Sequence, residues 1–367
     1  MPKRKGLYVK NYRRFVIFLI VLISIAVLVV GVVLFNLSRN SLESAFVPAK
    51  IDDDMQYNIL EDYYLTLSGD ILSRYDYSGE AVWSKKVYDE GLNLYASDKL
   101  IVIYSNKNLQ VLTVEGDYLY STDVIGTINK VYCGNNIVAV FSVIVGEDEK
   151  KENMIYFYNT SGSLFDSISF FPQYIIDFGF LGGDDLWVLT ADPTNVVPVS
   201  RIITYKPGVS MTGLINLYSE LAYKTYFTAD NMYVATTENL IKYDLFGQKL
   251  GSNLIYDWEI KAVNLTIGGN FFAIVPRSQN NEPFYSNARI INESVSYKVN
   301  LPKNVEDMAM YETNLYLFGQ DTIYVYSSKG EYLRQYKLDD KINYISFASG
   351  RKVLVKKEGL YYFLDLP

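Results

Sequence analysis

The sequence predicts an all-β fold made of repeated four-stranded units, preceded by one N-terminal transmembrane helix. Three observations support this prediction: an uncharged apolar run near the N-terminus, short alternating runs of apolar and polar residues that recur after it, and an excess of aromatic residues. Among 367 residues there are 34 Tyr, 19 Phe and 3 Trp, and aromatic side chains favour strands over helices. With 49% hydrophobic residues, the chain is far too apolar for a disordered protein.

The uncharged run covers residues 15–37 and reads FVIFLIVLISIAVLVVGVVLFNL. As a helix with a rise of 1.5 Å per residue, it is longer than the roughly 30 Å hydrocarbon core of a bilayer. A cleaved signal peptide is the alternative. Its apolar region is ordinarily about 7–15 residues long and ends at a small-residue cleavage site, whereas Val47-Pro48-Ala49 lies far downstream. We therefore expect an uncleaved membrane anchor.

The charges on either side of this run predict its orientation. Six basic residues and no acidic residue precede it: Lys3, Arg4, Lys5, Lys10, Arg13 and Arg14. Because basic flanks stay in the cytoplasm, residues 1–14 are expected inside the cell and residues 38–367 outside. Removing these six from the 34 basic residues leaves 28 against 41 acidic ones, a net charge of −13 for the outer part. This charge argues against nucleic acid as a partner.

Alternating runs on both sides of a tight turn recur seven times, for example SRYDYSGEAVW at 73–83 and IYFYNTSGSLFDSI at 155–168. Such runs are typical of antiparallel hairpins. A further apolar strand precedes the hairpin, as DLWVLT does at 185–190, and a shorter apolar segment precedes that strand. The turns are spaced 37, 46, 46, 39, 46 and 37 residues apart, at Gly79, Gly116, Gly162, Gly208, Gly247, Glu293 and Gly330.

Four strands in each unit of roughly 40 residues are the signature of a β-propeller blade. One further period of 37 residues after Gly330 reaches residue 367, so the eighth unit holds three strands and lacks its outermost one. Residues 43–51 (ESAFVPAKI) lie one period before the first unit. We expect them to close the last blade by pairing with residues 359–366, which leaves no blade open. The sequence therefore predicts an eight-bladed β-propeller over residues 38–367, with seven blades possible if the irregular sixth unit is not a blade.

The segment YDYSGEAVW at 75–83 resembles the quinoprotein-type (PQQ-like) propeller repeat, which reads roughly aliphatic-x-D-x-x-T/S-G-x-x-x-W. YDLFG at 243–247 matches the first half of that repeat, and YSSKG at 326–330 matches it more loosely. In layout, the chain after residue 37 is similar to uncharacterised single-pass, propeller-bearing envelope proteins of Gram-positive bacteria. The resemblance implies a fold and a location. It brings no catalytic residue with it.

Composition excludes several kinds of chemistry. The chain has no histidine, which excludes a Ser-His-Asp system and zinc sites that need imidazole. Cys133 is the single cysteine; it can form no intrachain disulfide, and it is expected to be a small buried residue. Quinoprotein dehydrogenases typically have a vicinal cysteine pair, and this chain has none. The acidic groups at 52–54, 184–185 and 339–340 lack the spacing of a calcium-binding loop. We therefore expect no catalytic residue, no cofactor and no metal.

Three units are longer than the others, and each extra stretch lies between the second and third strands, at 145–153, 191–200 and 276–287. In a propeller these connections all emerge on the same face. Long loops on one face of a rigid scaffold commonly bind ligands or partners. The candidate binding residues are Glu147, Lys150, Asp192, Asn195, Arg277, Asn281, Phe284 and Tyr285.

Two functions remain open. The first is a membrane-anchored, non-catalytic binding or scaffold module for a cell-envelope protein or a wall polymer. The second is an extracellular glycan-active hydrolase or lyase that uses Asp, Glu or Tyr as acid and base. The first is favoured because no pair of carboxylates stands out in the sequence. Since residues 15–37 lead almost directly into the closing strand, we expect the short-turn face of the propeller to lie toward the membrane and the three long loops to point outward.

Overall fold

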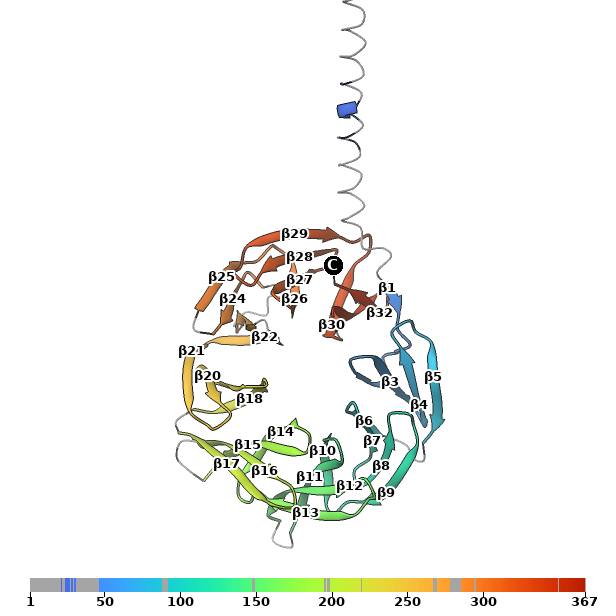
Figure 1. Cartoon of the computed structure of the whole chain (residues 1–367), viewed down its shortest axis with the longest axis vertical. Helices are drawn as coiled ribbons and strands as arrows, with labels where there is room; N and C mark the ends of the chain where they lie inside the picture. Colours follow the sequence, from blue (N-terminus) through green and yellow to red (C-terminus); the bar gives the residue numbers. More distant parts are fainter. Residues whose placement is uncertain are drawn as a thin grey trace, which may run out of the picture.

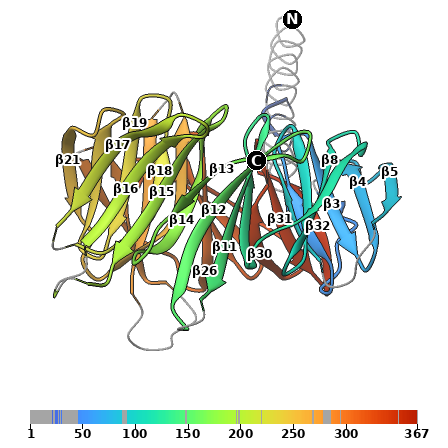
Figure 2. The same ribbon diagram turned by 90° about the horizontal axis from the view of Figure 1, so that it is seen from below.

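The computed structural model is an eight-bladed β-propeller, which confirms the all-β fold class and the number of blades. Eight four-stranded antiparallel sheets surround a common axis (Figure 1), and Figure 2 shows the same ring from the side. The structure describes residues 21, 24–26, 28, 30, 46–87, 92–146, 149–194, 196, 199–218, 220–266, 269–277, 285–293, 295–348 and 350–366.

The four strands of a blade follow one another from the axis outward. The innermost strands are β2 (Gln56–Ile59), β6 (Asn93–Ala96), β10 (Thr127–Cys133), β14 (Tyr174–Gly182), β18 (Ala222–Phe227), β22 (Trp258–Thr266), β26 (Val305–Tyr311) and β30 (Ile342–Phe347). The second strands are β3 (Tyr63–Ser68), β7 (Leu100–Tyr104), β11 (Ile137–Val145), β15 (Asp185–Asp192), β19 (Asn231–Thr236), β23 (Gly269–Pro276), β27 (Asn314–Gly319) and β31 (Lys352–Lys357). The third strands are β4 (Ile71–Asp76), β8 (Asn108–Thr113), β12 (Lys151–Asn159), β16 (Val199–Lys206), β20 (Asn239–Asp244), β24 (Asn287–Asn292), β28 (Thr322–Ser327) and β32 (Leu360–Asp365). The outermost strands are β5 (Ala81–Lys86), β9 (Tyr118–Asp123), β13 (Leu164–Ser169), β17 (Ser210–Leu217), β21 (Lys249–Leu254), β25 (Val295–Asn300), β29 (Tyr332–Lys337) and β1 (Phe46–Pro48). Blades are numbered one to eight in the order of their innermost strands.

The ring is closed by strands from distant parts of the chain. Three strands of blade eight are β30, β31 and β32, and β1 adds the fourth as an antiparallel neighbour of β32. Phe46 lies opposite Leu364, and Val47 lies opposite Phe363. In Figure 1 the blue β1 stands beside the red β32. Pro48 is tolerated because an outermost strand leaves one edge unpaired. This is the strand that the sequence places within 43–51.

The hydrophobic core is divided into eight clusters, one between each pair of neighbouring blades in the described part of the chain. Successive side chains of a strand point to opposite faces of its sheet. In β27, Leu315 and Leu317 therefore pack toward blade six, whereas Tyr316 and Phe318 pack toward blade eight. Both faces of each second strand are buried, which explains why these strands are continuously apolar instead of alternating.

The two faces of the ring carry different connections. Turns between first and second strands and between third and fourth strands lie on one face, called here the short-turn face. The three long loops all connect second to third strands, β11 to β12, β15 to β16 and β23 to β24, so they lie on the opposite face. This arrangement agrees with the placement expected from the repeat spacing.

Residues 21, 24–26, 28 and 30 are helical. The rest of the predicted span at 15–37 and the basic segment at 1–14 lie outside the described residues. Among the residues that the structure describes, there is no helix long and apolar enough to cross a membrane.

Candidate functional site

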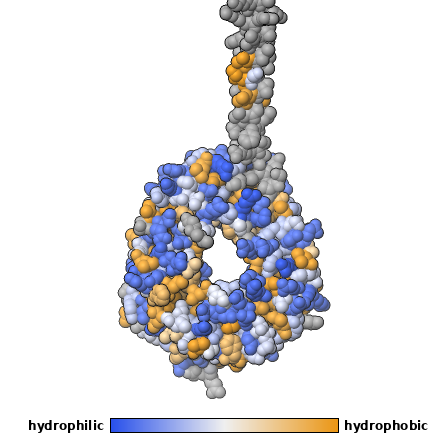
Figure 3. Space-filling view, viewed as in Figure 1, coloured by the Kyte–Doolittle hydropathy of each residue, from blue (hydrophilic) through white to orange (hydrophobic). Residues whose placement is uncertain are grey.

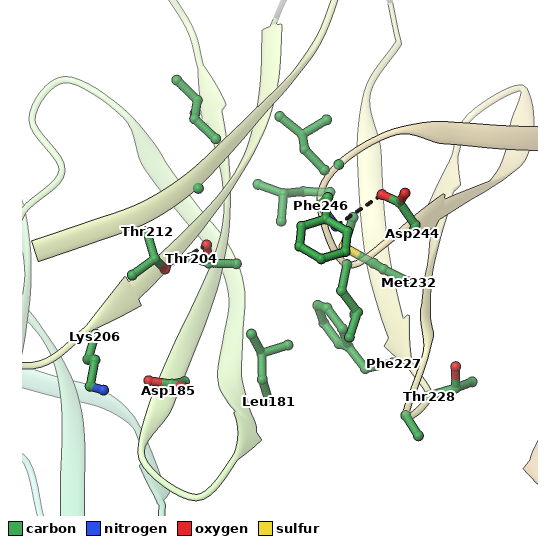
Figure 4. Close-up of a pocket in the computed structure, with 17 residues that line it drawn as sticks. Leu181, Asp185, Thr204, Lys206, Thr212, Phe227, Thr228, Met232, Asp244 and Phe246 are labelled. Carbon is green, nitrogen blue, oxygen red and sulfur yellow. Dashed lines mark hydrogen bonds between the residues drawn. The ribbon is translucent and has the colours of Figure 1, made fainter.

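A cavity of about 560 Å³ opens between blades four and five on the short-turn face. Figure 4 shows Phe227, Met232 and Phe246 of blade five on one side of it and Leu181, Thr204 and Thr212 of blade four on the other. Its volume falls within the range of roughly 300–1,000 Å³ that is common for ligand pockets. The remaining lining residues are Asp185, Ile202, Lys206, Gly213, Leu214, Ile215, Thr228, Ala229, Asp244, Leu245 and Gly247.

Beside the cavity, the turn of blade five meets the outermost strand of blade four. The turn glycine of a blade faces the outermost strand of the blade before it. A Cβ on Gly116 would lie 3.1 Å from the ring of Trp83, and one on Gly162 would lie 2.8 Å from the ring of Tyr120. Between blades four and five the corresponding contact is with Ile215, 3.1 Å from a Cβ on Gly247. The facing side chain is aromatic at the first two of these interfaces and aliphatic between blades four and five, as it also is between blades six and seven, where a Cβ on Gly330 would lie 2.9 Å from Val299.

The turn beside the cavity, residues 244–248, presents two apolar side chains to solvent. Phe246 is 98% exposed and Leu245 is 53% exposed. The turn itself is well defined: the Asp244 carboxylate accepts hydrogen bonds from the backbone N–H of Phe246 (3.0 Å) and of Gln248 (2.8 Å). The same arrangement at Asp76 holds a turn that carries polar Ser78 in the position of Phe246. The turn of blade five therefore has the same hydrogen bonds as that of blade one but exposes Phe246 where the other exposes a serine.

Polar groups border the cavity on the side of blade four. Thr212 donates a hydrogen bond from its hydroxyl to that of Thr204 (2.9 Å). The charged side chains of Lys206 and Asp185 also line it. A mostly apolar floor with a few polar groups at its border is typical of ligand-binding pockets.

A cluster of charged side chains lies near the axis of the ring, apart from the cavity. Figure 3 shows an open channel there, with hydrophilic surface around much of its mouth. On its wall the buried Asp177 of β14 accepts hydrogen bonds from Lys130 of β10 (2.7 Å) and Lys224 of β18 (3.0 Å). Burial by itself raises the pKa of Asp177, but the two lysines outweigh this effect and hold the pKa below its usual value. A carboxylate that pairs with two lysines and has a lowered pKa is ionised near neutral pH, which makes it a poor general acid, and it links three blades.

Asp307 holds the corresponding position on β26, again directly after a bulge in the innermost strand. It accepts a hydrogen bond from the backbone N–H of Met308 (2.8 Å), and its partial burial raises its pKa. Among the described residues, no group of three or more His, Cys, Asp or Glu side chains is arranged to hold a metal ion.

Four of the binding residues predicted from the long loops are described, and they do not form one cluster with the cavity. Asp192 is buried; its carboxylate accepts hydrogen bonds from Thr194 and pairs with Arg201 (3.0 Å), so it orders its own loop. Lys150 and Arg277 are exposed. Tyr285 is half-buried beneath the ammonium group of Lys261. The other four, Glu147, Asn195, Asn281 and Phe284, lie outside the described residues.

The cavity lies on the face opposite the long loops, so reasoning from loop length did not find it. One signal was available in the sequence. The turn at 244–247 reads DLFG, whereas the related turns read DYSG at 76–79, NTSG at 159–162 and SSKG at 327–330. An apolar pair within a tight surface turn is the departure that marks the site.

The similarity to proteins of known structure concerns the fold and not an activity. The crystal structure of BamB from Moraxella catarrhalis is 12% identical, with a TM-score of 0.50, and the match covers 88% of this chain and 98% of that one. The WD40 domain of SCAP from fission yeast is 13% identical, with a TM-score of 0.55 and the same coverage of both chains. At such low identity the similarity shows a shared propeller fold.

Among curated proteins, the putative BTB/POZ domain-containing protein L35 of Acanthamoeba polyphaga mimivirus is 30% identical over 135 residues, 35% of this chain and 27% of that protein. The match thus spans little more than a quarter of that relative. The model of the DUF5711 family matches residues 47–361, a range that reaches from β1 to β32 and includes strands of every blade. This chain therefore belongs to DUF5711, a family of unknown function.

Proposed function

We propose that this chain is a membrane-anchored, extracytoplasmic β-propeller that acts as a non-catalytic binding module for another protein of the cell envelope. The observation that carries the proposal is the exposed Phe246 beside the cavity between blades four and five. Burying an exposed Phe side chain against a partner contributes roughly 1.5–3 kcal/mol to the free energy of binding. A partner side chain in the cavity adds a similar amount, and a rigid turn limits the entropy lost on binding.

A protein partner fits this surface better than a wall polymer does. Wall polymers present hydroxyl, amide and charged groups, and burying these against Leu214, Phe227 and Met232 without hydrogen bonds is costly. Aromatic and aliphatic anchors that enter a pocket are typical of protein interfaces.

The proposed location rests on the uncharged run at 15–37 and on the six basic residues before it. The chain enters the propeller through β1, the outermost strand of blade eight, which begins on the short-turn face. Residues 38–45 can span at most about 3.5 Å each, so a membrane anchor at 15–37 keeps that face near the membrane. The partner is then a protein whose exposed part lies close to the bilayer.

The test is affinity capture after crosslinking in intact membranes of the cells that make the full chain. Phe246→Ser should lower the amount of captured partner at least about tenfold, because 1.4 kcal/mol of lost binding energy has that effect. Lys329→Ser is the matched control, since Lys329 holds the same position in the turn of blade seven, and capture should not change. Equal capture by both variants, or capture of a polymer and no protein, would overturn the proposal.

A further inference from the structure

β17 is the outermost strand of blade four. It lacks the charged residues and the proline that discourage the other outermost strands from pairing with another chain. Of the eight outermost strands described, the other seven each carry a charged residue or a proline. Charges and proline on an edge strand discourage pairing with another chain. β17 reads SMTGLINL and has neither. The corresponding residues of the other strands are Lys85 and Lys86, Asp123, Asp166, Lys249, Lys298, Arg334 and Lys337, and Pro48.

The unprotected edge also forms one wall of the cavity. Among the residues that the structure describes, β17 pairs with β16 on one side and has no neighbouring strand on the other. Thr212, Gly213, Leu214 and Ile215 line the cavity. Met211 is 55% exposed and Leu214 is 48% exposed on the same strand. The free edge and the cavity therefore form one continuous surface.

We infer that the partner binds by adding an extended segment to the edge of β17, with an apolar side chain of that segment in the cavity. This inference rests on the proposed function and names its mode of binding. In such strand addition, backbone hydrogen bonds supply affinity and pockets for alternate side chains supply specificity. β17 has eight residues, enough to pair with a typical strand of about six. Because no charge lies on the edge, the segment is uncharged where it pairs.

Charge favours a different protein over a second copy of this chain. Residues after 37 carry 28 basic and 41 acidic residues, a net charge of −13. Two such domains repel one another, whereas a partner with a basic surface is attracted. The segment therefore belongs to a protein whose surface around the uncharged strand is basic.

The experiment places the photocrosslinker p-benzoylphenylalanine in the full chain, in its own membranes, at Ser210, Met211 or Asn216 along β17, or at Phe246 beside the cavity. Adducts from all four sites should contain one protein. The residues linked to the three β17 sites should follow in order along one segment of about six to eight residues, as paired strands require. Leu214→Lys should lower these yields at least about tenfold. Leu250→Lys, on the exposed face of β21, is the matched control and should leave them unchanged.

The outcomes separate the two proposals. An adduct from Phe246 that persists in Leu214→Lys, with none from β17, overturns strand addition and leaves the binding function standing. Absence of adducts from every site overturns both. An adduct that joins two copies of this chain overturns the inference in favour of self-pairing.

Discussion

At the scale of single residues, Asp177 links side chains of three blades that no local sequence pattern connects. Its side chain is 8% exposed, and the side chains of the two lysines that pair with it are 44% and 46% exposed. Lys130, Asp177 and Lys224 come from three consecutive blades, so the cluster ties the inner ends of those blades together. Because both lysines remain partly solvated, the network costs less to form than a fully buried ion pair would.

Asp177→Asn should lower the free energy of unfolding by about 1–3 kcal/mol, because it leaves two lysines close together without their shared carboxylate. Asp70→Asn is the control; Asp70 pairs with the exposed Lys86, and its loss should cost under about 1 kcal/mol. Urea titration of the purified chain measures both.

The contribution of Asp177 to stability should depend on pH. Since the pKa of Asp177 is depressed in the folded state, its contribution to the free energy of unfolding is present above about pH 4 and is lost as pH falls through the folded pKa. The difference between wild type and Asp177→Asn should therefore shrink at pH 3.

At the scale of an element, the turn between third and fourth strands is the unit that repeats most faithfully. In blades one, three and five an Asp or Asn at its start accepts two backbone hydrogen bonds, and a glycine with positive φ follows. These contacts are local, so sequence shows them directly. The side chains that the turn exposes vary from blade to blade, and the proposed binding surface rests on Leu245 and Phe246 in blade five.

Gly162→Ala should destabilise the fold by about 1–3 kcal/mol. Gly162 has φ of 81°, and a Cβ there would lie 2.8 Å from the Tyr120 ring; both the left-handed backbone and the close contact penalise a side chain. Gly251→Ala on β21 is the control, because no atom lies within 4 Å of a Cβ there and its φ is not positive. It should change stability by less than about 0.5 kcal/mol. A thermal melt showing equal losses would contradict this account of the turn.

At the scale of the whole molecule, closure depends on β1. A chain that begins at residue 55 lacks β1 and also Ile51, which packs with Tyr64, Leu354 and Phe363 between blades eight and one. It should melt at least about 5 °C below a chain that begins at residue 40, and it should aggregate more readily because β32 then has an open edge. Light scattering during the melt follows both effects. Identical behaviour of the two chains would show that β1 contributes nothing to closure.

The proposed membrane topology makes a prediction of its own. Protease added to intact protoplasts should digest the propeller, residues 46–366, and leave the basic segment at 1–14 protected inside, because basic flanks remain in the cytoplasm. Replacing the six basic residues before the span by Gln removes that signal and should increase the protected fraction of propeller. Protection of the propeller in the unaltered chain would exclude an extracytoplasmic location.

The sequence by itself determined the repeat and the strands within its units, and it predicted eight blades, with seven left open, and the strand that closes the ring. These follow from alternation, turn residues and spacing, which act between near neighbours or through a regular period. The absence of charge from 210–217 was also readable, but its meaning depends on knowing that this strand is outermost. Only the tertiary structure decided where the cavity lies, because its lining residues come from two blades and meet only when those blades pack together. It also decided the channel cluster, since each lysine lies 47 residues from Asp177, and only the packing of consecutive blades brings them together.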